Sequence, residues 1–85
     1  MYYVYVLKSL KDGKIYTGFS SNLKQRILEH QDGLVSSTKN RRPLKLVYYQ
    51  SFLSEEDARL EEKYLKSGGK ARNSLKLRIK DSLTR

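Results

Sequence analysis

The dipeptide Asp12-Gly13 constrains the fold of this chain more than any other feature of its sequence. It separates two runs of aromatic, β-branched and apolar residues, at positions 2–7 and 15–19, which have the composition of strands. An Asp-Gly pair between two such runs is the strongest short-range signal for a β-hairpin, because the turn needs residues that tolerate a positive φ. We therefore expect the chain to begin with two antiparallel strands.

A two-residue turn at these positions also predicts which side chains share a face of the hairpin. The expected cross-strand pairs are Tyr5 with Ser20, Leu7 with Gly18, and Tyr16 with Ser9. Tyr5 and Tyr16 then point to the same side. The small residues Gly18 and Ser9 should leave open room beside them. The opposite side carries the expected core residues Val4, Val6, Ile15, Thr17 and Phe19. A one-residue bulge would exchange the two faces.

Helix-capping and helix-breaking residues divide the rest of the chain. Asn22 and Ser54 are expected to cap the N-termini of two helices, which end at Gly33 and at Gly68-Gly69. The expected elements are a helix from Asn22 to about Gln31, an exposed, mostly polar and basic loop over 34–43, a strand from Leu44 to Phe52, a helix from Ser54 to about Ser67 and a last helix from about Ala71 to Leu83. With the hairpin they give one α+β domain over residues 1–85, a small three-stranded, mainly antiparallel sheet flanked by helices in the order β-β-α-β-α-α.

The strongest signal in the composition is charge. The 18 Lys and Arg residues oppose 9 Asp and Glu residues, which gives a formal net charge of +9 and an isoelectric point near 9.9. Such a chain binds polyanions through the release of counterions, whether or not it reads a sequence. We therefore expect a nucleic-acid partner, with an anionic membrane or a ribosome surface as the alternatives that charge alone leaves open.

Several kinds of site are excluded by residues that the chain lacks. It contains no cysteine, so it has no disulfide, no thiolate chemistry and no cysteine-ligated zinc, and a reducing cytoplasm is the expected compartment. His30 is its one histidine, which excludes a histidine-rich metal site. No stretch approaches the ~20 apolar residues that span a bilayer. The first residues also lack the basic segment of a signal peptide.

Two helical stretches carry side chains suited to phosphate chemistry. Arg26 and His30 are four residues apart and share a helix face, which presents a guanidinium fork and a titratable ring together. Glu61 and Glu62 lie beyond the first turn of their helix, where the helix dipole no longer explains an acid. Either carboxylate could hold one magnesium ion, which binds few protein ligands and keeps several waters. Periodicity alone does not choose between them.

The order of these residues resembles that of a known family. Tyr3-Val4-Tyr5, ten intervening residues and Tyr16-Thr17-Gly18 are similar to the paired motif of the GIY-YIG nucleases. The resemblance continues through residues 22–30, the strand at 42–49 and the helix at 58–67, so that it covers nearly the whole chain. It points to the single-domain bacterial branch, which is similar to the nuclease end of excision-repair incision subunits. Tyr3 stands where the family's name residue is glycine.

The resemblance implies a role for each residue of the site. Tyr5 looks like the family's general base acting on water, and Tyr16 is similar to the tyrosine that supports that water. Arg26 resembles the arginine that faces the scissile phosphate, and His30 matches a histidine of some members. Glu62, rather than its neighbour, resembles the single carboxylate that holds one divalent cation, magnesium or manganese. Arg26 and this cation would each favour ionisation of Tyr5, since a phenol has an ordinary pKa of about 10.

Together these features predict a divalent-metal-dependent endonuclease that acts on DNA, in repair or in the processing of structured DNA, with DNA favoured over RNA. The residues expected to bind the phosphate backbone are Lys39, Arg41, Arg42, Lys66, Lys70 and Arg72. A nucleic-acid-binding module of the same fold that does not cut is the rival hypothesis, and a ribosome-associated or architectural basic protein is a third. A pure binder has no need of Glu62, because this carboxylate would repel the phosphate. The sequence does not decide the oligomeric state.

Overall fold

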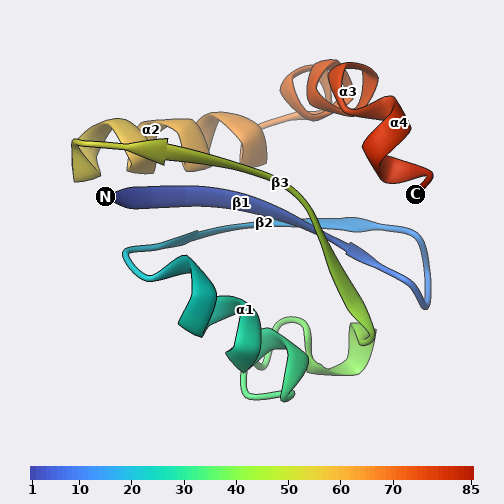
Figure 1. Cartoon of the computed structure of the whole chain (residues 1–85). Coiled ribbons are helices and arrows are strands. Elements are labelled where there is room, and N and C mark those ends of the chain that lie inside the picture. Colours follow the sequence, from blue (N-terminus) through green and yellow to red (C-terminus); the bar gives the residue numbers. More distant parts are fainter.

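The computed structural model describes residues 1–85 and contains one antiparallel sheet with helices on both of its faces (Figure 1). The strands are β1 (Tyr2–Ser9), β2 (Ile15–Ser20) and β3 (Leu44–Phe52), arranged in the order β2-β1-β3. The helices are α1 (Leu23–Gln31), the 3₁₀ helix η1 (Lys39–Arg41), α2 (Glu55–Lys66), α3 (Gly69–Arg78) and α4 (Lys80–Leu83). The predicted α+β class and the order β-β-α-β-α-α are therefore confirmed. No helix is both long enough and apolar enough to cross a membrane.

Two separate groups of apolar side chains hold the helices to the sheet. On one face, Val4 and Val6 of β1 pack against Ala58, Leu65 and Leu75 of α2 and α3. On the other face, the side chains that pack together are Tyr5, Leu7, Leu44, Tyr16, Leu23, Ile27 and Leu46. Figure 1 shows the result, with α1 on one side of the sheet and α2, α3 and α4 on the other. Alternate residues of a strand point to opposite faces, so this arrangement confirms the predicted division of the hairpin side chains.

The register of the hairpin differs from the prediction by two residues. Tyr5 pairs with Gly18 and Leu7 with Tyr16, because the connection is a four-residue loop rather than a two-residue turn. The loop is closed by hydrogen bonds from Ser9 N to Lys14 O (2.9 Å) and from Gly13 N to Ser9 O (2.8 Å). Gly13 does take a positive φ, of 74°. A shift of two residues keeps every side chain on its predicted face, since the period of a strand is two.

The open room expected beside Gly18 and Ser9 is absent. The Tyr5 ring lies directly over Gly18, where an added Cβ would come within 2.4 Å of the ring carbon Cζ. Ser9 is fully buried, and its hydroxyl donates to Arg41 O (2.7 Å) while accepting from the backbone of the hairpin loop. Both small residues therefore serve packing and turn formation rather than an empty cavity.

The helix caps predicted from the sequence are confirmed. Asn22 accepts a hydrogen bond from Gln25 N (3.2 Å) at the start of α1, and Ser54 accepts one from Asp57 N (3.3 Å) at the start of α2. Gly33 follows α1 with a φ of 77°, which favours glycine. Local polar contacts of this kind depend on a few neighbouring residues, so sequence alone identifies them well.

Two segments differ from the prediction. The stretch 34–43 is not simply an exposed loop, because Val35 and Thr38 are buried and η1 forms within it. The last helix begins earlier than predicted and breaks at Ile79 (φ −112°, ψ 26°) into α3 and α4. The break returns the chain to the sheet, where Ile79 packs against the core beside α2 and Lys8 Nζ donates to Leu83 O (2.6 Å).

Replacing Gly18 by alanine is expected to lower the free energy of unfolding by about 1–3 kcal/mol, the usual cost of adding a methyl group to a packed core. The Tyr5 ring cannot move aside freely, because it is fully buried and its hydroxyl is hydrogen-bonded to His30. Urea unfolding followed by circular dichroism measures the difference.

A matched control is Gly68→Ser, because no heavy atom lies within 4 Å of an added Cβ there and serine is a good N-cap. This variant should unfold close to the wild-type midpoint. An unchanged midpoint in Gly18→Ala would show that the Tyr5 ring is not confined against β2.

Candidate active site

Four of the residues predicted for the site lie together on the α1 face of the sheet. Tyr5 comes from the central strand, Tyr16 from the edge strand β2, and Arg26 and His30 from α1. The ring centres of Tyr5, Tyr16 and His30 are 5.3–6.5 Å apart. The Tyr5 hydroxyl lies 2.7 Å from His30 Nε2, a buried hydrogen bond between residues far apart in the sequence. The hairpin and the first helix thus meet at a phenol–imidazole contact.

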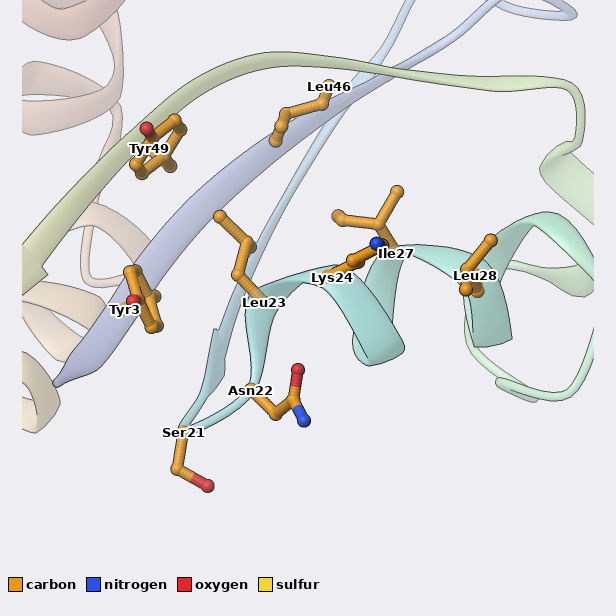
Figure 2. A pocket seen from close by; sticks show the side chains of 9 residues that line it. All are labelled: Tyr3, Ser21, Asn22, Leu23, Lys24, Ile27, Leu28, Leu46 and Tyr49. Carbon is orange, nitrogen blue, oxygen red and sulfur yellow. The ribbon is translucent and has the colours of Figure 1, made fainter.

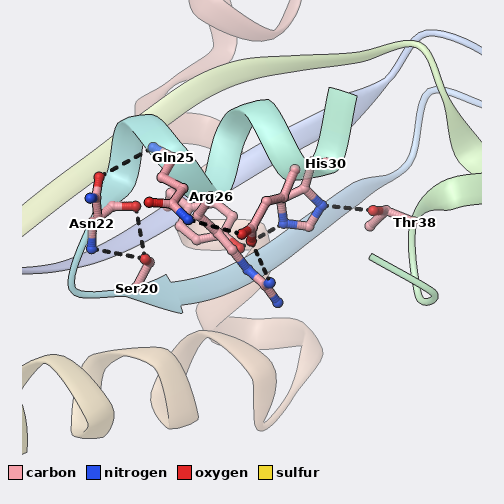
Figure 3. A network of polar contacts seen from close by, with 8 residues as sticks. Ser20, Asn22, Gln25, Arg26, His30 and Thr38 are labelled. Atoms are coloured by element: carbon pink, nitrogen blue, oxygen red, sulfur yellow. Dashed lines mark hydrogen bonds and ion pairs between the residues drawn. The ribbon is translucent and has the colours of Figure 1, made fainter. Parts of the chain in front are cut away.

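His30 is fully buried, and both of its ring nitrogens are engaged. Nε2 faces Tyr5, and Nδ1 lies 2.7 Å from the hydroxyl of Thr38. Figure 3 marks the contact between His30 and Thr38 with a dashed line. Burial lowers the pKa of His30 below its ordinary value, and the charge of Arg26 adds to this effect while Glu29 opposes it. The neutral ring therefore carries one N–H, so one of its nitrogens accepts a hydrogen bond. Thr38 was not predicted, because nothing distinguishes it from the other polar residues around it.

Arg26 is the cation whose charge acts on the buried phenol of Tyr5. Its Nη1 atom donates to Glu29 Oε1 at 3.0 Å, and its side chain is 37% exposed. Hydrogen bonding to Glu29, and then to Tyr5, raises the pKa of Arg26. The guanidinium borders an open hollow of about 370 Å³ at the start of α1. A ligand can therefore reach Arg26 from solvent, whereas Tyr5 and His30 are enclosed behind it.

Tyr5 is a neutral phenol in this environment. Burial raises its pKa to about 12, although Arg26 acts in the opposite direction. The charges of Tyr16 and Glu62 raise the pKa further. The prediction that Arg26 favours ionisation is correct in direction, but desolvation of the buried hydroxyl outweighs it.

Glu62 approaches the same region from the other face of the sheet. It lies on α2, its side chain is only 16% exposed, and its carboxylate contacts Lys66 Nζ (2.9 Å) and Arg59 Nη1 (3.4 Å). Lys66 Nζ in turn lies 5.9 Å from the centre of the Tyr16 ring. Glu62 therefore lies beside the edge strand β2, near enough for its charge to act on Tyr5. Its neighbour Glu61 makes no ion pair.

The side chains of the site can hold one hydrated cation, but not a metal ion that needs several protein ligands. The structure contains no group of three or more His, Cys, Asp or Glu side chains that could hold a metal ion. The charge of Glu62 acts on Tyr5, and two positive side chains contact its carboxylate. Magnesium and manganese accept a single carboxylate together with water and substrate oxygens. A structural zinc site, which needs four protein ligands, is not compatible with these residues.

The predicted backbone-binding residues divide into two groups. Lys39, Lys70 and Arg72 are exposed and make no ion pair, whereas Arg41 contacts Asp12 Oδ2 (3.6 Å) and Lys66 pairs with Glu62.

Arg42 makes several contacts within the chain. Its Nε donates to Lys39 O (3.0 Å), its Nη1 donates to Gln31 O (3.4 Å), and its guanidinium covers Gly33. The prediction treated all six cations alike, because a sequence does not show which of them find partners within the chain.

A second, apolar hollow of about 540 Å³ lies between the start of α1 and the strands β1 and β3 (Figure 2). Its walls include Tyr3, Leu23, Ile27, Leu46 and Tyr49, and no carboxylate borders it. The Tyr3 ring lies 6.3 Å from the Tyr49 ring, so the residue at the family's glycine position belongs to this wall. The hollow has no metal ligand and is separate from the contact between the buried phenol and the imidazole.

The arrangement of the site agrees with the family resemblance seen in the sequence. The small antiparallel sheet and α1 bring together two tyrosines, an arginine and a histidine, and one glutamate of α2 lies near them. The chain belongs to the GIY-YIG family, whose catalytic domain matches residues 1–80. Membership of this family supports a nuclease-type function, which implies nucleic-acid binding, and GIY-YIG nucleases generally use a divalent metal.

Its relatives include small proteins of the same family. The UPF0213 protein CPE1444 of Clostridium perfringens is 43% identical over 67 residues, which cover 78% of this chain and 71% of that protein. A UPF0213 protein of Limosilactobacillus reuteri is 41% identical over 68 residues, covering 76% of this chain and 70% of that one. The solution NMR structure of the UPF0213 protein BH0048 from Bacillus halodurans matches with a TM-score of 0.58 and 33% identity, covering 94% of this chain and 86% of that one. The predicted family is therefore confirmed.

His30 is expected to make stability depend on pH between about pH 5 and pH 7. In the unfolded chain its pKa returns to about 6.5, whereas the buried ring stays neutral to lower pH. As the pH falls below this value, the unfolded chain takes up a proton that the folded chain does not. The free energy of unfolding therefore falls, with a slope approaching about 1.4 kcal/mol per pH unit. Urea unfolding across this pH range measures the slope.

The control is His30→Gln, which removes the one histidine of the chain. We expect this variant to be less stable at neutral pH but nearly insensitive to pH in the same window. A wild-type stability that stays constant from about pH 7 to pH 5, or a slope retained in the variant, would contradict a neutral buried His30.

Proposed function

We propose that this protein is a divalent-metal-dependent endonuclease that hydrolyses phosphodiester bonds in DNA, in repair or in the processing of structured DNA. The observation that carries the proposal is the buried hydrogen bond between Tyr5 and His30, with Arg26 on its solvent side. Glu62 adds the carboxylate that a divalent cation requires. Together they supply a proton acceptor, a phosphate ligand and a metal ligand.

The hydrogen bond explains how Tyr5 acts as a base although its pKa is about 12. A phenol of this pKa is scarcely ionised near neutrality, so loss of its proton to solvent is not available. Tyr5 is fully buried, so the attacking water has to enter beside Arg26. When Tyr5 donates its O–H to Nε2 of neutral His30, the proton can pass to the ring as Tyr5 accepts one from this water. The water oxygen then bonds to phosphorus as the bond to the leaving oxygen breaks, and the leaving oxygen takes a proton from solvent. His30 is then an imidazolium, whose Nδ1–H is donated to the hydroxyl of Thr38. The proton remains on a buried, hydrogen-bonded ring.

Arg26 provides the positive charge that the phosphate needs. Its guanidinium has five N–H donors, and Glu29 engages one of its nitrogens, so others are free to bind a phosphate oxygen from the hollow beside it. A divalent cation at Glu62 would polarise the phosphate and neutralise the charge that develops during the reaction. Lys66 and Arg59 hold the Glu62 carboxylate in position.

DNA is compatible with water as the nucleophile. Attack by water leaves no chemical role for a ribose 2′-hydroxyl, so DNA is a competent substrate for these residues. The cations near the site are suited to phosphates rather than to base edges. We therefore propose that the protein selects the shape of its substrate rather than its sequence.

One observation favours a nucleic-acid-binding module that does not cut. Both oxygens of Glu62 contact positive side chains, and the same residue contributes to the high pKa of Tyr5. If Lys66 and Arg59 serve only to neutralise Glu62, the site binds phosphate without holding a metal.

Cleavage of plasmid, branched and flapped DNA with magnesium or manganese distinguishes the two functions. Tyr5→Phe should lower kcat/KM by roughly 10²–10⁴-fold, because it removes the hydroxyl and keeps the ring. Arg26→Ala and Glu62→Gln should each lower it by about 10²–10³-fold. Gel-based rate measurements under single-turnover conditions provide these values.

The matched control is Glu61→Gln, which makes the same change one residue earlier on α2 and should leave the rate near that of the wild type. Equal cleavage by all variants would identify a contaminating nuclease and remove the enzyme proposal. Binding without cleavage by the wild-type protein, on every substrate and with either metal, would establish the binding module instead.

A further inference from the structure

Helix α3 and the residues beside it carry positive charge that nothing in the chain neutralises. Residues 67–80 contain five cationic side chains and no acid; they are Lys70, Arg72, Lys76, Arg78 and Lys80. None of these five side chains forms an ion pair. In α2, by contrast, three acids of the first turn precede two lysines of the last turn. The charge of α3 is therefore available to an external anion.

Two of these five residues, Arg72 and Lys76, line a hollow of about 440 Å³ at the end of the hairpin. Arg72 and Lys76, four residues apart on α3, meet Lys14 of the hairpin and Arg41 of η1 around it. Like charges at this helical spacing repel each other. Four cations from three separate segments thus surround one concave surface.

The single acid of this hollow does not balance it. Asp12 contacts Arg41 at 3.6 Å, and its carboxylate accepts a hydrogen bond from the backbone N–H of Lys14 (2.9 Å). This backbone bond is the main reason that the pKa of Asp12 is lowered. Asp12 therefore carries one full negative charge, which leaves the hollow with a net positive charge. A phosphate is the anion that such a group of lysines and arginines binds best.

The hollow continues into the candidate active site. A neighbouring hollow of about 270 Å³ is bordered by Tyr16, Lys66 and Arg72, among others. Arg72 and Ile15 line both hollows. Because β2 is an edge strand, no further strand covers this side of the sheet (Figure 1). A path along the outer edge of β2 therefore leads from Tyr16 to the hairpin loop.

We propose that the nucleic-acid strand on one side of the scissile phosphate runs along this path, and that Arg72, Lys76 and Lys14 bind its phosphates. This inference rests on the proposed function, since it assigns the route of the same substrate. From Tyr16 to Lys14, the residue before β2, an extended chain advances roughly 7 Å at ~3.3 Å per residue. That distance equals the rise of about two nucleotides along the axis of a B-form duplex, at ~3.4 Å each. The path therefore engages the phosphates next to the site of cleavage.

The first experiment measures binding without cleavage. Fluorescence anisotropy of a fluorescein-labelled forked DNA, in EDTA and over a series of salt concentrations, compares the wild type with the double variant Arg72→Gln/Lys76→Gln. Loss of two phosphate contacts should weaken binding by roughly tenfold near 0.1 M salt and reduce the slope of log K against log salt by about 1.4–1.8. The control is Arg78→Gln/Lys80→Gln, which removes the same charge from residues that line neither hollow.

The second experiment tests the direction of the path. After the position of the cut is mapped, the DNA is shortened close to the cut on one side and then on the other. Shortening one particular flank should abolish the difference in binding between wild type and Arg72→Gln/Lys76→Gln, whereas shortening the other should preserve it.

The results of these two experiments distinguish failure of the proposed strand path from failure of the proposed nuclease function. If the two double variants weaken binding equally, or if neither shortened flank removes the difference, the route is wrong while the nuclease proposal stands. The same holds if the protein cuts DNA and Arg72→Gln/Lys76→Gln binds like the wild type. If the wild-type protein neither binds nor cuts any of these DNAs, the proposed function and the route fail together.

Discussion

The Tyr5 side chain lies between the edge strand and α1, with its ring against the backbone of Gly18 and its hydroxyl in contact with His30. This position links the hairpin to α1, and it adds a hydrogen bond to the apolar contacts that Leu23 and Ile27 make with the same face of the sheet. The ring can lie flat on β2 because residue 18 has no side chain. The hydroxyl then reaches an imidazole that Thr38 holds from behind. One buried phenol therefore sets both the packing of α1 and the chemistry available beside it.

The sequence predicted the faces of the hairpin but not its register. Asp12-Gly13 signals a reversal of the chain, yet its glycine can take a positive φ in a two-residue turn or at the end of a four-residue loop. Ser9 selects the longer loop, because its buried hydroxyl accepts from the backbone of Lys11 and Asp12. That preference depends on Arg41, which lies 32 residues away and whose backbone carbonyl accepts a hydrogen bond from the Ser9 hydroxyl. A contact over such a distance leaves no local pattern to detect.

In the candidate site, too, the sequence predicts residues that lie close together in the chain better than residues that only the fold brings together. Arg26 and His30 are visible as a pair, because four residues place them on one helix face. Thr38 gives no such signal, since its role arises only when the loop after α1 folds back onto the imidazole. Glu62 differs from Glu61 through its position beside β2, which only the packing of α2 establishes. Helical periodicity therefore finds groups that share one element, whereas the choice of Glu62 came from the family resemblance and Thr38 was missed.

Arg42, which was predicted to bind the phosphate backbone, also stabilises the end of α1. Its guanidinium spans the carbonyls of Gln31 and Lys39 and covers Gly33, so it ties the end of α1 to the segment that leads into β3. Since β3 pairs with the central strand, this tether anchors the helix to the sheet at the end opposite its N-cap. A helix held at both ends cannot slide along its strands. The position of α1, and with it the place of Arg26, therefore depends in part on a second arginine at the other end of the helix.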